Sequence, residues 1–320
     1  MQNIEALMEE TNFDIVIIGA GTAGMTAAIY AARAGKTVLL LEEAAVGGQI
    51  INALNIENYP AAKEISGFDF SMTLLSQVQA LGVSIKYEKA LKISEKSGEK
   101  SSKIVSTAKN SYFAKAVIIA SGLKKREIGL ENEKKLIGKG ISYCATCDGR
   151  FFKGKKVAVY GGGNTAIEDA IFLSDYCEEV FVITRSENFR ADKNTLETLK
   201  KRANVSFLPN FTIKSLGENE EKLESITLSG TKAGNSEKIL PISALFVAIG
   251  QIPQNEAFKE ILQLDESGFI KTDENCFTLT DGIFAAGDCR TKSVRQLVTA
   301  ASDGAIAALS AVKYINEFWG

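Results

Sequence analysis

The chain has 320 residues, of which 45% are hydrophobic and 24% are charged, and its formal net charge is −2. This length and composition predict about two globular domains, each able to bury a core. Because Lys and Arg are dispersed among Asp and Glu, the charge indicates neither a nucleic-acid nor a membrane partner. Histidine is absent, which excludes mechanisms that need a histidine base.

The start of the chain and its apolar runs predict where the protein is found. Residues 1–11 are polar and acidic, unlike the basic and then apolar start of a secretory signal. Apolar runs such as residues 116–120 are far too short to span a bilayer. The five cysteines are an odd number, which does not resemble a secreted disulfide scaffold. We therefore expect a cytoplasmic protein.

A βαβ unit is predicted near the start of the chain. Gly19, Gly21 and Gly24 form a Gly-x-Gly-x-x-Gly pattern between an apolar strand and an Ala-rich helical stretch, and Glu42 ends the next strand. This fingerprint allows a tight turn, close approach of a pyrophosphate and close helix packing, with the helix N-terminus stabilising the phosphate. Glu42 would accept hydrogen bonds from an adenosine ribose, so the site suits FAD or NAD. A purely structural turn with a surface Glu is the competing interpretation.

The middle of the chain carries a dithiol motif. Residues 44–70 are predicted to be loop-rich and 71–81 helical, with strands up to about residue 120. Cys144-Ala-Thr-Cys147 and Asp148 follow. A Cys-x-x-Cys pair is redox-active or metal-binding.

Redox chemistry is the favoured interpretation of this pair. The chain offers no further close ligands for a metal, so no metal site is expected. A dithiol would attack a partner disulfide through a mixed disulfide. Asp148 is the nearest candidate proton donor, and a turn or helix-capping role is the alternative for it.

A second βαβ unit follows the dithiol. Gly161, Gly163 and Ala166 form the Gly-x-Gly-x-x-Ala variant of the fingerprint. Thr184 occupies the position that corresponds to Glu42, since both lie 23 positions after the first glycine of their turn. The carboxylate is lost and two arginines follow, Arg185 and Arg190, which favours NADPH. Ordinary solvated arginines are the alternative, and Glu187 weakens the case.

The remainder of the chain predicts β-hairpins over residues 204–240, a strand at 244–250, a strand at 282–288 that ends in Gly-Asp, and a terminal amphipathic helix at 295–315. We interpret the second βαβ unit as inserted within the first domain. Two dinucleotide sites imply electron transfer between a nicotinamide and a flavin.

Seven short motifs occur together in a characteristic order. They are Gly19-Ala-Gly-Thr-Ala-Gly24, Gly47-Gly-Gln49, Asn55-Ile-Glu-Asn-Tyr-Pro60, Cys144-Ala-Thr-Cys-Asp-Gly149, Gly161-Gly-Gly-Asn-Thr-Ala166, Phe284-Ala-Ala-Gly-Asp288 and Arg295-Gln296. Over nearly the whole chain this resembles the low-molecular-weight thioredoxin reductases. The resemblance implies an α/β fold with two Rossmann-like domains, the second inserted into the first. It places an FAD domain at 1–122 and 249–320 and an NADPH domain with the dithiol at 123–248. It also implies a homodimer and thioredoxin, or a thioredoxin-like disulfide protein, as partner.

The resemblance also assigns roles to residues. Cys147 would contact the flavin, Cys144 would attack the partner, and Asp148 would be the acid. The FAD residues would be Gly19, Gly21, Gly24, Glu42, Gly47, Gly48, Gln49, Asn58, Gly287, Asp288, Arg295, Gln296 and Leu297. The NADPH residues would be Gly161, Gly163, Asn164, Thr165, Arg185 and Arg190. The family alternates two orientations of its NADPH domain.

One departure concerns the electron donor. The family usually has His-Arg-Arg at the NADPH phosphate, whereas this chain has Thr184-Arg-Ser186. A lost charged hydrogen bond costs about 1.5–3 kcal/mol. NADH or a protein donor such as ferredoxin therefore stays open, as does another disulfide protein as partner. A non-catalytic flavin redox sensor is the remaining alternative. Cys177 is expected in the core, and Cys276 and Cys289 receive no role.

Overall fold

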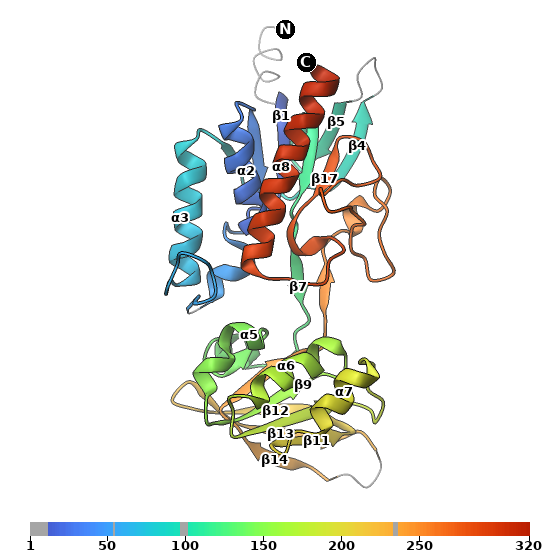
Figure 1. The fold of residues 1–320 in the computed structure, drawn as a ribbon. Helices are drawn as coiled ribbons and strands as arrows, with labels where there is room; N and C mark the ends of the chain where they lie inside the picture. The colour runs from blue at the N-terminus through green and yellow to red at the C-terminus, as the bar shows by residue number, and fades with distance from the viewer. Residues whose placement is uncertain (1–11, 54, 97–101, 233–235) are drawn as a thin grey trace. The chain divides into compact units, whose positions relative to one another are not determined.

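The computed structural model describes residues 12–53, 55–96, 102–232 and 236–320, drawn in colour in Figure 1. The first eleven residues, on which the absence of a secretory signal was predicted, lie outside these ranges. Within the described ranges, no helix is long and apolar enough to cross a membrane. The chain divides into two compact units, Met1–Lys124 with Ile252–Gly320, and Lys125–Gln251. The second unit is continuous in sequence and interrupts the first.

The first unit is built on a mixed sheet with the strand order β3-β2-β1-β6-β5-β4, and β17 also pairs with β6. Its strands are β1 (Asn12–Ile18), β2 (Val38–Leu41), β3 (Ser84–Lys86), β4 (Lys92–Lys96), β5 (Ser102–Ser106), β6 (Ser111–Ile119) and β17 (Ile283–Ala285). Its helices are α2 (Thr22–Arg33), α3 (Gly67–Ala80) and α8 (Leu297–Trp319), with short 3₁₀ turns η2 (Gly48–Asn52), η4 (Glu256–Phe258) and η5 (Gly287–Cys289).

The long strand β6 pairs with β1 along one edge and with two different strands along its other edge. Its first half pairs antiparallel with β5, with Ala114 opposite Lys103. Its second half pairs parallel with β17, with Val117 opposite Ile283. The strand thereby joins a parallel βαβ sheet to an antiparallel hairpin, and it uses a segment that comes after the second unit.

The apolar runs of β1, β2 and β6 supply both faces of this sheet because side chains alternate along a strand. Ile15 and Ile17 pack with the alanines of α2 and α8, whereas Val16 and Ile18 pack with Phe258 and its neighbours on the opposite face. Helices α2 and α8 lie side by side in Figure 1. They approach closely, because a Cβ on Gly304 would lie 2.2 Å from the carbonyl oxygen of Ala23.

The second unit contains a parallel five-stranded sheet of order β11-β10-β9-β15-β8 and an antiparallel sheet of order β12-β13-β14. The strands are β8 (Ile141–Ser142), β9 (Lys156–Tyr160), β10 (Glu179–Thr184), β11 (Val205–Pro209), β12 (Phe211–Asn219), β13 (Lys222–Gly230), β14 (Lys238–Pro241) and β15 (Ala244–Val247). The helices are α4 (Glu133–Leu136), α5 (Ala145–Asp148), α6 (Asn164–Ser174) and α7 (Lys193–Lys200), with η3 (Gly149–Phe152). The connecting segments β7 (Leu123–Lys125) and β16 (Gln251–Pro253) pair with each other.

The two Rossmann-like βαβ units confirm the predicted fold class, and three local expectations need correction. Strand β11 is not part of a hairpin, because it extends the parallel sheet beside β10; its apolar residues resemble those of the hairpin that follows. Helix α3 begins earlier than residue 71, since Ser66 caps it by accepting from the N–H of Asp69. Helix α8 begins at Leu297 and runs to Trp319, so Arg295 precedes it and Gln296 is its N-cap.

Candidate functional site

The first glycine turn joins β1 to α2. Gly19 has a φ of +104°, and a Cβ there would lie 2.4 Å from the carbonyl oxygen of Ala120. A Cβ on Gly24 would lie 1.8 Å from the carbonyl oxygen of Gly19. Gly21 is the N-cap of α2, so no side chain of the N-cap residue covers the first N–H groups of the helix. The turn therefore requires glycine, and it presents the positive N-terminal end of α2.

Glu42 and the Gly47-Gly48 turn lie beside this helix start. The Glu42 carboxylate accepts from the N–H of Ala20 at 2.8 Å and from the N–H of Ala44 at 2.9 Å. Gly47 pairs with Gly21 in an isolated bridge, and Gly48 has a φ of +62°. Glu42 thus holds the glycine turn in addition to the ribose role that the sequence predicted for it.

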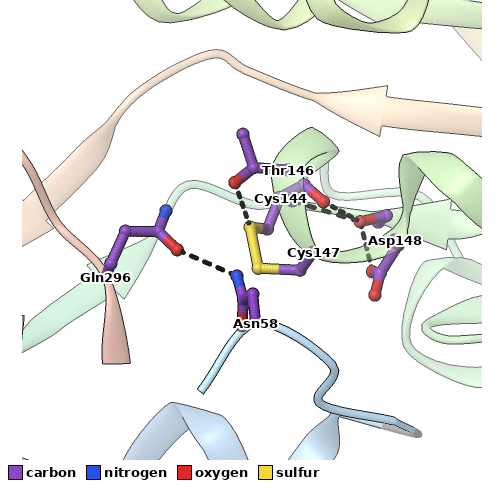
Figure 2. The surroundings of a disulfide bond; sticks show 7 residues. Asn58, Cys144, Thr146, Cys147, Asp148 and Gln296 are labelled. Atoms are coloured by element: carbon purple, nitrogen blue, oxygen red, sulfur yellow. Dashed lines mark hydrogen bonds between the residues drawn. A yellow bond between two sulfur atoms is a disulfide. The ribbon is translucent and has the colours of Figure 1, made fainter. Parts of the chain in front are cut away.

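Two side-chain amides of the predicted flavin set, those of Gln49 and Asn58, donate to protein partners. The Gln49 side chain donates to the carbonyl oxygen of Leu123. Asn58 Nδ2 donates to Gln296 Oε1 at 3.3 Å, a bond that Figure 2 also draws. Leu297 begins α8 directly after Gln296. These contacts fix the conformation of both amides within the first unit.

The Gly287-Asp288 turn contains an unsatisfied carboxylate oxygen. Asp288 Oδ1 is buried and has no hydrogen-bond partner among the described residues. Burial raises the pKa of Asp288, while the charges of Lys292 and Arg295 oppose the shift. Arg295 Nε donates to the backbone carbonyl of Asp288 at 3.4 Å, and its guanidinium lies over the Phe269 ring. An orphaned buried acceptor is rare, so this oxygen marks a place where a polar ligand group fits.

A buried charge network that the sequence did not predict lies behind this turn. Asp303 is 4% exposed and accepts from Arg290 Nε at 2.8 Å, Arg290 Nη2 at 2.9 Å and Lys292 Nζ at 2.8 Å. It also accepts from the N–H of Gly287 at 3.0 Å. Burial raises the pKa of Asp303, but the bonds from Arg290 and Lys292 outweigh burial and hold it below its usual value. A charged residue on the buried, Ala-rich face of the terminal helix was the signal that could have revealed it.

The dithiol lies in the second unit at the start of α5. Cys144 and Cys147 form a disulfide with a Cα–Cα distance of 5.3 Å, and Figure 2 shows its surroundings. Cys144 is the N-cap of α5, and its Sγ lies 3.4 Å from Thr146 Oγ1. Cys144 is half-buried, whereas Cys147 and Thr146 are exposed. The pair is therefore formed and accessible on a short, defined element.

Asp148 is tied to the backbone of the dithiol through a serine. Ser142 Oγ donates to Asp148 Oδ2 at 2.6 Å, and the N–H of Cys144 donates to Ser142 Oγ at 3.1 Å. Burial raises the pKa of Asp148, although the bond from Ser142 and the charge of Lys125 oppose the shift. The carboxyl therefore keeps its proton to a higher pH than an exposed aspartate does, as a proton donor requires.

A second buried carboxylate supports the same region. Glu133 is 1% exposed and accepts from the N–H groups of Ile128 and Gly129, both at 2.8 Å. It also accepts from the Tyr143 hydroxyl at 2.6 Å. Lys125 Nζ lies 4.8 Å from the centroid of the Tyr143 ring, and burial lowers the pKa of Lys125 while the charge of Asp148 opposes the shift. Sequence reasoning missed Glu133, Tyr143 and Lys125.

The second glycine turn joins β9 to α6. A Cβ on Gly161 would lie 2.2 Å from the carbonyl oxygen of Ala248, and Gly163 is the N-cap of α6 without a side-chain bond. Asn164 Oδ1 accepts from the N–H of Asp192, which in turn caps α7. Thr165 is exposed on the first turn of α6. The helix start is again open, and Asn164 connects it to the loop after β10.

That loop carries the predicted phosphate arginines. Arg185 and Arg190 are exposed, and no ion pair is formed by either within the described part of the chain. The N–H of Arg190 donates to the carbonyl of Gly162 at 2.8 Å, which places the loop against the glycine turn. Glu187 accepts from Lys232 at 2.6 Å and Asn210 at 3.1 Å. The carboxylate of Glu187, which weakened the prediction, is therefore paired with Lys232, which follows β13, and not with either arginine.

The three remaining cysteines are buried and unpaired with each other. Burial raises the pKa of Cys177 to about 11, of Cys289 to about 11 and of Cys276 to about 12. These thiols remain protonated near neutral pH, which makes them poor nucleophiles. Across the described ranges, no group of His, Cys, Asp and Glu side chains is arranged to hold a metal ion.

The two Rossmann-type units and the Cys-x-x-Cys disulfide define a class of dinucleotide-dependent oxidoreductases. The sequence profile described as pyridine nucleotide-disulphide oxidoreductase matches residues 13–304, and the chain belongs to this family.

Relatives agree with this assignment. A thioredoxin reductase of Listeria innocua is 40% identical over 309 residues, which cover 97% of this chain and 96% of that protein. A "34.2 kDa protein in rubredoxin operon" of Clostridium pasteurianum is 42% identical, with 97% and 99% covered. The crystal structure of thioredoxin reductase from Streptococcus pyogenes matches with a TM-score of 0.90 and 37% identity, covering 96% of this chain and 99% of that one. The predicted resemblance to the thioredoxin reductases is thereby confirmed.

Proposed function

We propose that the protein is an FAD-dependent thioredoxin-disulfide reductase that takes electrons from NADPH and delivers them through Cys144 and Cys147 to thioredoxin or a thioredoxin-like protein. The single observation that carries the proposal is the disulfide on α5 within a chain that has two dinucleotide-type glycine turns. The family and the named relatives support the same conclusion.

The first unit has the features that an FAD site needs. The open N-terminus of α2 suits the pyrophosphate, and the backbone of the Gly47-Gly48 turn packs directly against it. The unpartnered Asp288 Oδ1 suits a hydroxyl of the ribityl chain. Arg295, Gln296 and Leu297 would hold the ring portion. A bound FAD supplies a two-electron carrier, and the chain supplies its position and charge environment.

The second unit has the features that a nicotinamide dinucleotide site needs. The open N-terminus of α6 suits a pyrophosphate. Arg185 and Arg190 suit a 2′-phosphate, because no carboxylate among the described residues forms an ion pair with them and Glu187 is occupied by Lys232. Ser186 contributes no charge where the family usually has Arg, so the expected preference for NADPH rests on two arginines.

The dithiol would reduce a partner disulfide by exchange. In the reduced protein, the Cys144 thiolate attacks one sulfur of the partner and releases the other as a thiolate. Cys147 then attacks the mixed disulfide, which restores the Cys144–Cys147 bond and completes a two-electron reduction of the partner. Asp148, with its pKa raised by burial, would donate a proton to the released thiolate. In this assignment Cys147 is the thiol on the flavin side and Cys144 the exchange thiol.

Other features of the proposal follow from the family rather than from contacts of this chain. We propose a homodimer, a cytoplasmic location and the assignment of FAD to the first unit and NADPH to the second. Ser186 is the specific observation that favours a second candidate, in which the same dithiol chemistry draws on NADH or a protein donor.

The test is anaerobic titration of the flavin band with NADPH and with NADH, in wild type and in Cys144→Ser. We expect NADPH to bleach the band in both proteins and only wild type to reduce thioredoxin. Cys177→Ser is the matched control and should reduce thioredoxin normally. Thioredoxin reduction by Cys144→Ser would contradict the dithiol mechanism, and a flavin that only a chemical reductant bleaches would move the electron source to another donor.

A further inference from the structure

Lys292 and Arg295 are two of the cations in the chain between Asp288, which carries the unpartnered carboxylate oxygen, and the start of α8. Both act on the charge of Asp288, and the Lys292 side chain is only 9% exposed. A buried ammonium beside a buried carboxylate normally pairs with it. Lys292 instead donates to Asp303, which lies within α8, at 2.8 Å.

Asp303 retains one of these two cations, Lys292, and it also binds Arg290. It receives both Arg290 nitrogens and Lys292 on its two oxygens, and its Oδ2 also accepts from the N–H of Gly287, directly before Asp288. Arg290 is anchored further by Thr272 Oγ1 at 3.0 Å. One buried carboxylate therefore holds two cations and fixes the backbone of the turn.

We propose that Asp303 is a positioning residue for the FAD site, which sequesters Lys292 so that the Asp288 carboxylate keeps an oxygen free for the cofactor. This inference rests on the proposed FAD site in the first unit. Without the Asp303 charge, Lys292 would turn to Asp288, occupy its free oxygen and compete with a ligand hydroxyl. The network thus controls which acceptor of the site remains available.

The test measures FAD affinity of the apoprotein by flavin fluorescence, with no turnover required. We expect Asp303→Asn to weaken FAD binding about tenfold or more, equivalent to the loss of one charged hydrogen bond. Asp303→Asn combined with Lys292→Met should recover affinity to within about threefold of wild type, because the competing cation is gone. A role limited to anchoring α8 predicts no such recovery, and the thermal stability of each apoprotein is measured alongside.

Several outcomes would overturn the inference. One is an FAD affinity of Asp303→Asn equal to that of wild type. Another is a double variant, Asp303→Asn with Lys292→Met, that binds FAD no better than Asp303→Asn. Lys292→Met alone keeps Asp303 bound to Arg290 and Gly287, and it remains informative if Asp303→Asn does not fold. We expect its FAD affinity to stay within about threefold of wild type; a tenfold loss would show that Lys292 supports FAD rather than competes for Asp288. A wild-type chain that binds no FAD would refute the proposed function itself.

Discussion

The two glycine turns have the same spacing and different chemistry. In each, a glycine lies against a backbone carbonyl of a neighbouring strand end, Ala120 in the first unit and Ala248 in the second. The first turn is then closed by Glu42, whose carboxylate binds two backbone N–H groups. The second has Thr184 at that position, and its hydroxyl donates to the carbonyl of Ser186. The backbone thus sets where a dinucleotide could lie, and the residue at the end of the second strand of each βαβ unit sets which charge the dinucleotide could carry.

The largest effect is expected where the first turn is packed most tightly. Gly24→Ala would place a methyl 1.8 Å from the Gly19 carbonyl oxygen, and neither backbone can give way cheaply. We expect a loss of about 3 kcal/mol or more in the free energy of unfolding, with loss of FAD. Chemical denaturation and the flavin content of the purified protein measure it.

The second turn supplies the matched control for Gly24→Ala. It already has an alanine at the equivalent position, so Ala166→Gly should cost only about 1 kcal/mol. Equal effects of the two substitutions would contradict the difference in packing.

The next largest effect is expected from removing the arginines of the loop beside the second turn. Arg185→Ala and Arg190→Ala should each raise the KM for NADPH about tenfold or more, as expected for loss of a charged hydrogen bond of about 1.5–3 kcal/mol. The KM for NADH should change little. Lys193→Ala, which removes an exposed cation from the start of α7, is the control. A similar loss for both nucleotides would assign the arginines a structural role instead.

A substitution with a smaller expected effect would give the second turn the carboxylate that the first turn has. Thr184→Glu restores the carboxylate of the first unit, which should repel a 2′-phosphate and accept from a ribose hydroxyl. We expect the ratio of kcat/KM for NADPH over NADH to fall by about fivefold to tenfold. Thr184→Gln, of equal size and without charge, should shift it less. An unchanged ratio would mean that this position does not face the nucleotide.

The smallest expected effect is the pH dependence of the free energy of unfolding, and its sign differs between the two units. The pKa of Asp303 is held below its usual value by Arg290 and Lys292, so its ionised form stabilises the first unit above about pH 3.9, and this contribution is lost as pH falls through the lowered pKa. The pKa of Asp148 is raised by burial, so its ionisation costs the second unit stability as pH rises through the raised pKa.

Unfolding free energies between about pH 3 and pH 7 would reveal both signs. Relative to wild type, Asp303→Asn should lose less stability on acidification, and Asp148→Asn should gain stability as pH rises. The same sign in both variants would contradict the assignment.

Sequence patterns predicted the features that are formed by residues close together in the chain. The glycine turns and the Cys-x-x-Cys pair are each contained within a few consecutive residues, so spacing and residue type identified them. Neither Asp303 nor Glu133 belongs to a short motif of this kind. The charge of Asp303 on an Ala-rich helix face could have marked its position, but its partners are identified only by folding. Asp303 accepts from Gly287, sixteen positions earlier in the chain. Strand β11 was misassigned for a related reason, since only its pairing with β10 distinguishes it from the hairpin strands that follow.

The dual pairing of β6 has a consequence for biosynthesis. The edge of its second half that pairs with β17 has no partner until β17 is made, and β17 comes after the whole of the second unit. The second unit, by contrast, forms its sheets from contiguous sequence and can complete them while the ribosome is still translating. We expect a released chain truncated after residue 251 to protect residues 125–251 from protease while β6 remains cleavable. During translation, the apolar edge of β6 therefore stays unpaired until the last quarter of the chain has been made. A chaperone would be needed most at this edge.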